Sequence, residues 1–491
     1  MYFYGIMDIL KKIGLWTGPA LMVLMLLLPH PEALTPEAWK VLAMAALMIV
    51  WWVTEAIPIP VTSLLPIICL PLLGVGSVKE SAAPYSNPVV FLFMGGFMVA
   101  IAMEKWNLHR RIALSIIRLT GTNANGILLG FMLATGFLSM WISNTATAVM
   151  MLPIAVSVIE LLTRNNGESN EKGIRNFALA MMLGIAYCAS IGGMATIIGT
   201  PPNVVLKGFV RDQYNYEIGF GQWMLAGFPF AALLLGITWF MLVKVLYPNK
   251  LGNFEGGKEL IRQEFAQLGA MSKGEVGALV VFAGTALLWM FGGLINKVIP
   301  GLKLSDEGIA LIGATALFLY PLDFGKGKFI LDWRDTQHLP WGILLLFGGG
   351  LSLADALAKT GIIDLIGNQF AGLESAGFLL ILGLTAVSLY LTEVMSNVAL
   401  VTIFLPVVGG VAVGAGIDPI LVLMPVTLAA SCAFMLPMST PPNAIVFASG
   451  HIKIAQMVRA GFWLNIIAIL LIAALVEPMV QLIFSDWITA K

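Results

Sequence analysis

The sequence predicts an all-α membrane protein that crosses the bilayer many times. Of its 491 residues, 59% are apolar and only 11% are charged, whereas a soluble protein is about one-quarter charged. Most of the surface must therefore face lipid. Apolar runs of about twenty residues recur from end to end, the length of a membrane-spanning helix and too long for the alternating strands of a β-barrel.

We predict about eleven crossing helices and two further apolar segments that do not cross. The predicted crossings are residues 15–29, 38–58, 61–76, 88–104, 177–206, 222–246, 276–299, 306–321, 340–358, 418–450 and 455–484. The other two segments, 126–162 and 374–415, are each interrupted by a polar tripeptide. Their arms of about 16 residues span roughly 24 Å, less than the ~30 Å hydrocarbon core. We expect them to be re-entrant hairpins.

The distribution of basic residues predicts the orientation in an inner or plasma membrane. With the N-terminus in the cytoplasm, nineteen of the 27 Lys and Arg residues fall on cytoplasmic segments and eight lie outside, as the positive-inside rule requires. The C-terminus is then outside. The first apolar run follows Lys11 and Lys12 but no small-x-small cleavage site comes after it, so we expect an uncleaved helix and not a signal peptide.

The two halves of the chain resemble each other. WISNTATAVMMLPIAV (141–156) matches VMSNVALVTIFLPVV (394–408), which separates Ser143 and Ser396 by 253 positions, and GTPPN (199–203) matches STPPN (439–443) at an offset of 240. Each half holds five predicted crossings, an odd number, so the second copy is expected to be inverted. The predicted organisation is an N-terminal segment with the first helix (1–37), a first repeat (38–246), a cytoplasmic linker (247–275) and a second repeat (276–484).

The polar breaks predict an anion-binding site. Ser143-Asn144-Thr145 and Ser396-Asn397-Val398 each separate two apolar arms, and Ser and Asn favour the first position of a helix. Each second arm then points its positive N-terminal end into the protein, where it can hold an anion without Arg or Lys. A lone break of this kind is usually a packing device; four breaks paired across a repeat favour a site.

The second pair of breaks makes the same prediction. Thr200-Pro201-Pro202-Asn203 and Thr440-Pro441-Pro442-Asn443 fall inside the apolar runs 177–206 and 418–450. Proline stops the incoming helix, and threonine before proline restarts one. Upstream, the backbone carbonyls of residues 190–193 are expected to be free to coordinate a hard cation such as sodium.

Four other ionisable residues in apolar surroundings could have either a structural or a functional role. For Glu55 and Glu104 we favour structural pairing, the second with its neighbour Lys105. Asp355 stays a candidate by its context, and Glu393 is expected more often to be structural than to tune cation binding. The segment 107–119, with three arginines among Ile and Leu, predicts an amphipathic interfacial helix.

Several function classes are disfavoured. Lys and Arg balance Asp and Glu at 27 each, without a basic block, which argues against nucleic acid. The three cysteines stand singly and no Ser/His/Asp set or HExxH motif occurs, so neither a metal framework nor a membrane enzyme is predicted. An ion channel would fit the spans, but broken helices in a repeat suit a carrier better.

The chain resembles the divalent anion:sodium symporters over nearly its whole length. The resemblance rests on WWVTEAIPIPVTSLLP (51–66), GGFMVAIAMEKWNLHRRIAL (95–114), and the two SN(T/V) and two TPPN motifs. It implies a homodimer in which a scaffold stays fixed while the hairpins and broken helices move as an elevator. It further implies sodium-coupled symport of dicarboxylates such as succinate, malate or fumarate. The alternatives are a citrate or tricarboxylate symporter and a sodium-independent dicarboxylate exchanger.

The resemblance also implies the ligands. The substrate would meet Asn144, Thr145, Thr200, Pro201, Asn397, Val398, Thr440 and Pro441. The first sodium ion would meet Ser139, Ser143, Asn144, Gly192 and Gly193, and the second would meet Thr392, Met395, Asn397 and Ser439. Val398 departs from the family, where many dicarboxylate carriers have threonine, so the choice between succinate and citrate stays open.

Overall fold

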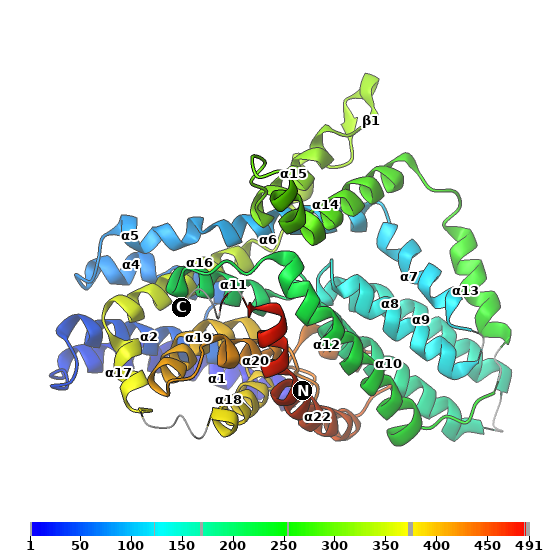
Figure 1. Ribbon diagram of the computed structural model, residues 1–491. Coiled ribbons are helices and arrows are strands. Elements are labelled where there is room, and N and C mark those ends of the chain that lie inside the picture. Colours follow the sequence, from blue (N-terminus) through cyan, green and yellow to red (C-terminus); the bar gives the residue numbers. More distant parts are fainter. Residues whose placement is uncertain are drawn as a thin grey trace.

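The structure is a computed structural model that describes residues 2–121, 123–166, 170–252, 255–371, 377–485 and 487. The regular structure of these residues is mostly α-helix (Figure 1), as the sequence predicts. The exception is a small antiparallel hairpin of strands β1 (Pro321–Asp323) and β2 (Lys328–Phe329), which projects from one end of the molecule.

The first half of the chain forms thirteen α-helices and two irregular turns. They are α1 (Tyr2–Leu27), α2 (Pro36–Thr54), α3 (Ile59–Thr62), α4 (Leu65–Leu72), α5 (Val78–Ala82), the 3₁₀ turn η1 (Ala83–Ser86), α6 (Pro88–Lys105), α7 (Leu108–Leu119), α8 (Ala124–Ser139), α9 (Asn144–Asn166), α10 (Glu171–Gly193), α11 (Pro201–Tyr214), α12 (Phe220–Phe240), the π-helical turn η3 (Met241–Leu246) and α13 (Glu255–Gln267).

The second half forms nine. They are α14 (Lys273–Val298), α15 (Asp306–Leu319), α16 (Trp341–Lys359), α17 (Ile362–Asn368), α18 (Gly377–Thr392), α19 (Asn397–Gly414), α20 (Ile420–Ala430), α21 (Pro441–Ala448) and α22 (Ile454–Ile483), with 3₁₀ turns η4 (Phe324–Lys326) and η5 (Trp333–His338) before α16.

Ten helices in the described part of the chain are long and apolar enough to cross a membrane. The predicted crossing at 61–76 is not one long helix: it folds into α3 and α4, of 4 and 8 residues, which both pack on α16. Pro60 lies against Gly342 at one end of α16, and Leu70 and Val75 line a hollow with Lys359 at the other end. Prolines 60, 66 and 71 explain the difference, because each removes a backbone donor and so keeps one long helix from forming.

The two predicted hairpins are less symmetrical than expected. Their first arms, α8 and α18, have 16 residues each. The second arms are longer, with 18 residues in α19 and 23 in α9. The prediction of short arms is wrong for both second arms, because the apolar stretches of 21 residues in α9 and 18 residues in α19 are each long enough to cross.

The two ends of helix α6 mark two opposite faces of the molecule. Asn87 caps its start by accepting a hydrogen bond of 3.0 Å from the Val89 amide, and Lys105 at its other end binds the Asp335 carboxylate at 2.7 Å. Its 18 residues span about 27 Å. We call these ends the Asn87 face and the Lys105 face. Helix α15 runs beside α6, with Gly95 lying against the Ala310 backbone.

The predicted linker 247–275 contains the helix α13, which binds α7. Arg110 of α7 donates to the Glu264 carboxylate at 2.6 Å, Arg111 binds Glu275, and Arg118 lies over the Phe265 ring. The segment 107–119, predicted as an amphipathic interfacial helix, therefore packs against α13 and α14, where its arginines meet carboxylates.

The helices that carry the sequence motifs pack together. Helix α10 contacts α8, α9, α12 and α21, and α19 contacts α11, α16 and α20. In Figure 1, α8, α9, α10 and α12 lie on one side of the molecule and α2, α4, α5 and α16 on the other, with α11, α19 and α20 between them. The motif segments thus meet near the centre.

Candidate functional site

Both Ser-Asn tripeptides interrupt helices. Helix α8 ends at Ser139 and α9 begins at Asn144; α18 ends at Thr392 and α19 begins at Asn397. Ser143 caps α9, since its hydroxyl accepts from the Ala146 amide at 3.2 Å. Ser396 has no side-chain cap bond, although its dihedral angles are those of a cap.

The first break forms a cluster of oxygen atoms. The Ser139 hydroxyl lies 2.6 Å from the Asn144 amide oxygen and 2.6 Å from the Ala189 carbonyl oxygen. The end of the Asn144 amide that faces α10 lies 3.1 Å from the Ala189 carbonyl oxygen and 3.3 Å from that of Gly199. Turning the amide places its nitrogen at this position, where it donates to both carbonyls and to the Ser139 hydroxyl.

The second break repeats this arrangement. The Thr392 hydroxyl lies 2.7 Å from the Asn397 amide oxygen and 2.8 Å from the Ala430 carbonyl oxygen. Thr392 is buried, as is Ser139 in the first copy. Each motif asparagine is therefore held by a buried hydroxyl that also touches a carbonyl of the neighbouring broken helix.

The second cluster has more acceptors than donors, and so does the first when the Asn144 oxygen faces Ser139. A hydroxyl group carries one hydrogen, so Ser139 and Thr392 can each donate to only one of the two oxygens beside them. Hydroxyl, amide and carbonyl oxygens are the ligands that a hard cation prefers. The residues present thus fit one sodium ion in each cluster.

Both TPPN segments interrupt helices as well. Helix α10 ends at Gly193 and α11 begins at Pro201, while α20 ends at Ala430 and α21 begins at Pro441. The motif asparagines, which we did not include in the predicted site, fold back onto the unwound backbone. Asn203 donates to the Thr196 carbonyl at 2.8 Å, and Asn443 donates to those of Ala433 and Leu436 at 3.0 and 3.1 Å.

Glu393 holds the second of these breaks. Its buried carboxylate accepts from the backbone amides of Phe434, Met435 and Leu436 at 2.8, 2.9 and 3.2 Å and from the Asn465 side chain at 2.8 Å. These contacts favour the structural interpretation of Glu393 over a role beside the cation.

A cavity of about 900 Å³ lies where the four breaks meet. Predicted site residues that line it are Ser143, Asn144, Thr145, Thr200, Pro201, Met395, Asn397, Val398, Ser439, Thr440 and Pro441. It extends to Glu55, Pro340 and Gly342, which lie toward the Lys105 face, and the exposed side chains of Val394 and Met438 also line it.

Four predicted ligands do not line the cavity. Ser139 and Thr392 lie behind the asparagines that they bind. Gly193 lies against Asn144: a Cβ atom there would come within 2.8 Å of the amide oxygen. Gly192 instead packs against the Gly136 backbone of α8, which leaves no room for any side chain.

Some cavity residues were not predicted as part of the site. Phe93 and Phe97 of α6 and Trp52 of α2 line it. Two of them fall within the segments 51–66 and 95–114 that carry the family resemblance, which was the available signal. Among the described lining residues the only ionisable one is Glu55, so no basic side chain faces a bound anion there.

Of the three other carboxylates that the sequence analysis singled out, two lie next to a lysine with which they form an ion pair. Glu55 lies 3.8 Å from Lys11, which confirms its predicted pairing. The expected pairing of Glu104 with Lys105 is wrong, because Lys105 points to Asp335 and Asp332 instead. Asp355 pairs with Lys359 one turn later at 2.7 Å.

Four helix N-termini reach the cavity. Helices α9, α11, α19 and α21 all begin at residues that line it. Unpaired amides and the helix dipole give each such end about half a positive charge. The cavity can therefore attract an anion through the backbone.

The chain is similar to a family of sodium symporters and to transporters of dicarboxylates. Residues 11–485 match the family model described as the sodium:sulfate symporter transmembrane region. The sodium-dependent dicarboxylate transporter SdcS of Staphylococcus aureus (strain USA300) is 42% identical over 479 residues, which cover 97% of this chain and 92% of that protein. SdcS of Staphylococcus saprophyticus is 42% identical over 474 residues, or 96% and 91% of the two chains.

Two solved structures share the fold at low sequence identity. The Alcanivorax borkumensis YdaH transporter superposes with a TM-score of 0.55 at 13% identity and covers 89% of this chain and 98% of its own. Neisseria gonorrhoeae MtrF, from a class of antimetabolite efflux pumps, gives 0.53 at 14% identity and covers 95% and 97%.

Proposed function

Because the chain belongs to the sodium:sulfate symporter family, we propose that it carries dicarboxylates such as succinate, malate or fumarate across the cell membrane together with sodium ions. The observation that carries the proposal is the pairing of two sequence-related oxygen clusters, at Asn144 and Asn397, on a single cavity that four helix N-termini reach. The relatives named as sodium-dependent dicarboxylate transporters support the substrate class.

Sodium coupling follows from the charges. A dicarboxylate brings two negative charges into a site where isolated charge is very costly. The helix N-termini offset part of this charge, and the described cavity lining offers no Lys or Arg. One cation in each oxygen cluster would balance a dianion. The first site takes Ser139, Ser143 and Asn144, with the nearby carbonyls of Ala189 and Gly199 beside the Gly193 backbone.

The second site takes Thr392, Asn397 and Ser439 with the Met395 carbonyl, and the Ala430 carbonyl lies next to it. The substrate carboxylates would then lie against Asn144, Thr145, Asn397 and Val398 and the starts of α11 and α21. All of these residues line the same cavity.

We also propose how the chain is arranged in the membrane. Two inverted repeats, 38–246 and 276–484, each contain a re-entrant hairpin (126–162 and 374–415) and a broken helix. Support comes from the matching offsets of the motifs and from the arms α8 and α18, which are too short to cross. With the N-terminus in the cytoplasm, the Lys105 face is cytoplasmic, so the cavity is inward-facing. The family resemblance adds a homodimer and an elevator motion of the hairpins and broken helices.

Transport by purified protein in liposomes tests the function. We expect labelled succinate to accumulate when sodium is higher outside, and uptake to fall to background when choline or potassium replaces sodium. The rate should rise cooperatively with sodium concentration, with a Hill coefficient above one. Undiminished uptake in choline would overturn sodium coupling and favour the exchanger.

The same liposomes separate the alternative substrates. Val398 removes a hydroxyl that many dicarboxylate carriers have at this position, so citrate is the second candidate. Unlabelled succinate, citrate and sulfate are compared as competitors at equal concentration. Succinate should compete best; stronger competition by citrate or sulfate would change the assigned substrate and leave the sodium sites in place.

A further inference from the structure

Helix α11 joins the cavity to the opposite face of the molecule. Its first residues, Pro201 and Pro202, line the cavity, while Lys207, Arg211 and Asp212 lie further along the same 14-residue helix. These three charged residues contact the Asn87 face. Because α11 is one rigid element of about 21 Å, movement at the substrate end must move the charged end as well.

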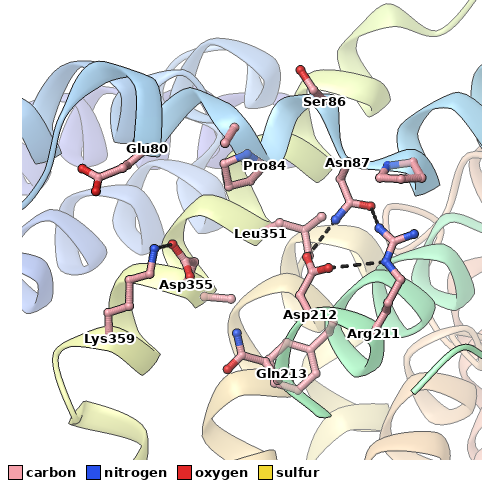
Figure 2. A pocket seen from close by; sticks show the side chains of 14 residues that line it. Glu80, Pro84, Ser86, Asn87, Arg211, Asp212, Gln213, Leu351, Asp355 and Lys359 are labelled. Carbon is pink, nitrogen blue, oxygen red and sulfur yellow. Dashed lines mark hydrogen bonds and ion pairs between the residues drawn. The ribbon is translucent and has the colours of Figure 1, made fainter. Parts of the chain in front are cut away.

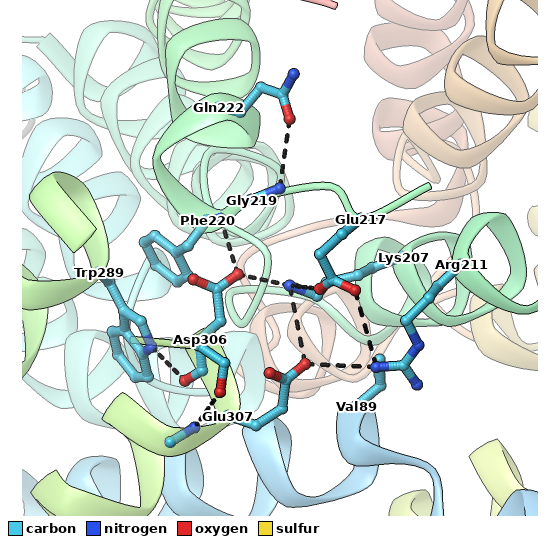
Figure 3. A network of polar contacts seen from close by, with 12 residues as sticks. Val89, Lys207, Arg211, Glu217, Gly219, Phe220, Gln222, Trp289, Asp306 and Glu307 are labelled. Atoms are coloured by element: carbon cyan, nitrogen blue, oxygen red, sulfur yellow. Dashed lines mark hydrogen bonds and ion pairs between the residues drawn. The ribbon is translucent and has the colours of Figure 1, made fainter. Parts of the chain in front are cut away.

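Lys207 is at the centre of a buried ion-pair network (Figure 3). The side chain is 1% exposed and its ammonium lies 2.5 Å from Asp306 at the start of α15, 2.8 Å from Glu217 and 4.0 Å from Glu307. Glu217 lies in the loop that follows α11, whereas Asp306 and Glu307 belong to α15. The pair of Lys207 and Asp306 therefore connects α11 to α15, which packs on α6.

A second contact joins α11 to the start of α6 (Figure 2). The Arg211 guanidinium donates to the Asn87 side-chain oxygen, and the Asn87 nitrogen donates to Asp212 at 2.7 Å. Arg211 and Asp212 also line a hollow of about 630 Å³ whose lining includes residues of η1 and α16. Beside this hollow, the polar contacts add to the packing of α11 on α16 and α6, where Gly208 lies against Leu351 and Val89.

The same boundary includes an aromatic stack. The Phe220 ring, at the start of α12, lies parallel to the Trp289 ring of α14, with centroids 4.8 Å apart. The Phe220 amide donates to the Asp306 carboxylate at 2.9 Å, and the Trp289 indole donates to the Asp306 carbonyl at 2.9 Å. Asp306, at the start of α15, thus contacts α11, α12 and α14 at one point.

We propose that Lys207, Arg211 and Asp212 form an ionic latch with Asp306 and Asn87 that holds the cavity closed on the Asn87 face. None of these five residues lines the cavity, and Asn87 lies at the opposite end of α6 from Lys105. The proposal rests on the proposed transport function, because a carrier must open its site to each side in turn. Opening to the Asn87 face separates α11 from α15 and α6.

The latch sets the balance between the two accessible states. Opening the latch separates the buried pair but lets both charges be hydrated again, whereas removing one partner leaves an unpaired buried charge that disfavours the closed state. Weakening the latch should therefore raise the population that is open to the Asn87 face. The rate of transport should change with it, while the sodium and substrate ligands stay intact.

Side-specific labelling tests the latch. Met438 lines the cavity and is 46% exposed, so Met438→Cys places a thiol there, while the three native cysteines are buried. A membrane-impermeant maleimide is applied to intact cells and to inverted vesicles, with and without sodium. The unaltered latch should give labelling mainly from the cytoplasmic side.

Two latch variants are compared in this background. Asp306→Asn removes the charge but leaves Lys207 paired with Glu217; Lys207→Met removes the ammonium entirely. Both should raise labelling from the outer side several-fold. Lys297→Met and Glu32→Gln change exposed charges away from the latch and should leave the ratio unchanged.

An unchanged ratio in correctly inserted Asp306→Asn protein would overturn the latch, as would an equal shift in the two controls. Sodium-driven succinate uptake is measured in parallel on the unaltered protein. Failure of that uptake would overturn the proposed function, whereas the labelling ratio depends only on which face is open. The two failures can therefore be told apart.

Discussion

The two broken helices beside the cavity are built from matching motifs but are held in different ways. In the first, Thr196 of the loop between α10 and α11 donates to the Met140 carbonyl at 2.6 Å, and Gly193 and Gly199 pack closely together. In the second, the residue that matches Met140 at the repeat offset is Glu393, whose carboxylate accepts three backbone amides of the loop.

The difference shows which part of the repeat the binding chemistry fixes. The hydroxyl, asparagine and carbonyl are arranged in the same way in both copies, at Ser139, Asn144 and Ala189 and at Thr392, Asn397 and Ala430. The supports behind them are free to differ. Glycine allows close backbone packing in one copy, and a buried charge orders the backbone in the other.

The largest expected effect tests what the copies share. Asn144→Ala and Asn397→Ala should each reduce sodium-driven succinate uptake at least about 100-fold, because each removes an oxygen from a buried cluster. Asn368→Ala, on the exposed face of α17, is the matched control. Uptake by either site variant near the normal rate, at equal amounts in the membrane, would contradict the assigned sites.

The second prediction tests what the copies do not share. Glu393→Gln should lower the free energy of unfolding by about 3 kcal/mol, because it replaces a charged acceptor of four hydrogen bonds with an amide. Met140→Leu should have little effect, because the contact of Met140 uses its backbone carbonyl. Thermal unfolding in detergent measures both, and equal losses would contradict the comparison.

The third prediction addresses the glycine support. Gly193→Ala should raise the sodium concentration for half-maximal uptake by about threefold to tenfold, because a methyl group there would press on the Asn144 amide and the Gly199 carbonyl. Gly236→Ala in α12 meets no atom within 4 Å and should leave the sodium dependence unchanged. An unaltered sodium dependence in Gly193→Ala would show that this contact does not shape the first site.

The smallest expected effect concerns the one position where the tripeptides differ. Val398→Thr gives the second motif the hydroxyl that Thr145 provides in the first, and should change the ratio of succinate to citrate uptake by about fivefold at most. Thr145→Val makes the reverse change in the other copy. If neither variant alters the ratio, selectivity is determined elsewhere, for example by Phe93 or Phe97 on the cavity wall.

The sequence predicted the parts of the site that need special residues. Helix breaks require polar or proline-containing segments, so the positions of Asn144, Asn397 and the two TPPN motifs could be read directly. The all-α fold followed from composition. Length arguments were weaker: the prolines in 61–76 shorten that segment to α3 and α4, and the polar end of α9 continues the helix.

Contacts that use ordinary residues gave no sequence signal. Any residue can offer a carbonyl, so the Ala189 and Ala430 oxygens could not be identified. The cavity wall from Phe93 and Trp52 depends on how α6 and α2 pack. The partner of Lys105 proved to be Asp335, 230 residues away, and not the adjacent Glu104, because a side chain on a helix reaches its spatial neighbours before its sequence neighbours.

The presence of one oxygen cluster in each half has a consequence for energy conversion. If each cluster takes one sodium ion with a dianionic substrate, no net charge crosses the membrane and the voltage does no work. All of the driving force then comes from the chemical gradient of sodium, counted twice. A roughly tenfold sodium gradient supplies about 1.4 kcal/mol per ion, so the cell could concentrate its substrate about 100-fold even across a depolarised membrane.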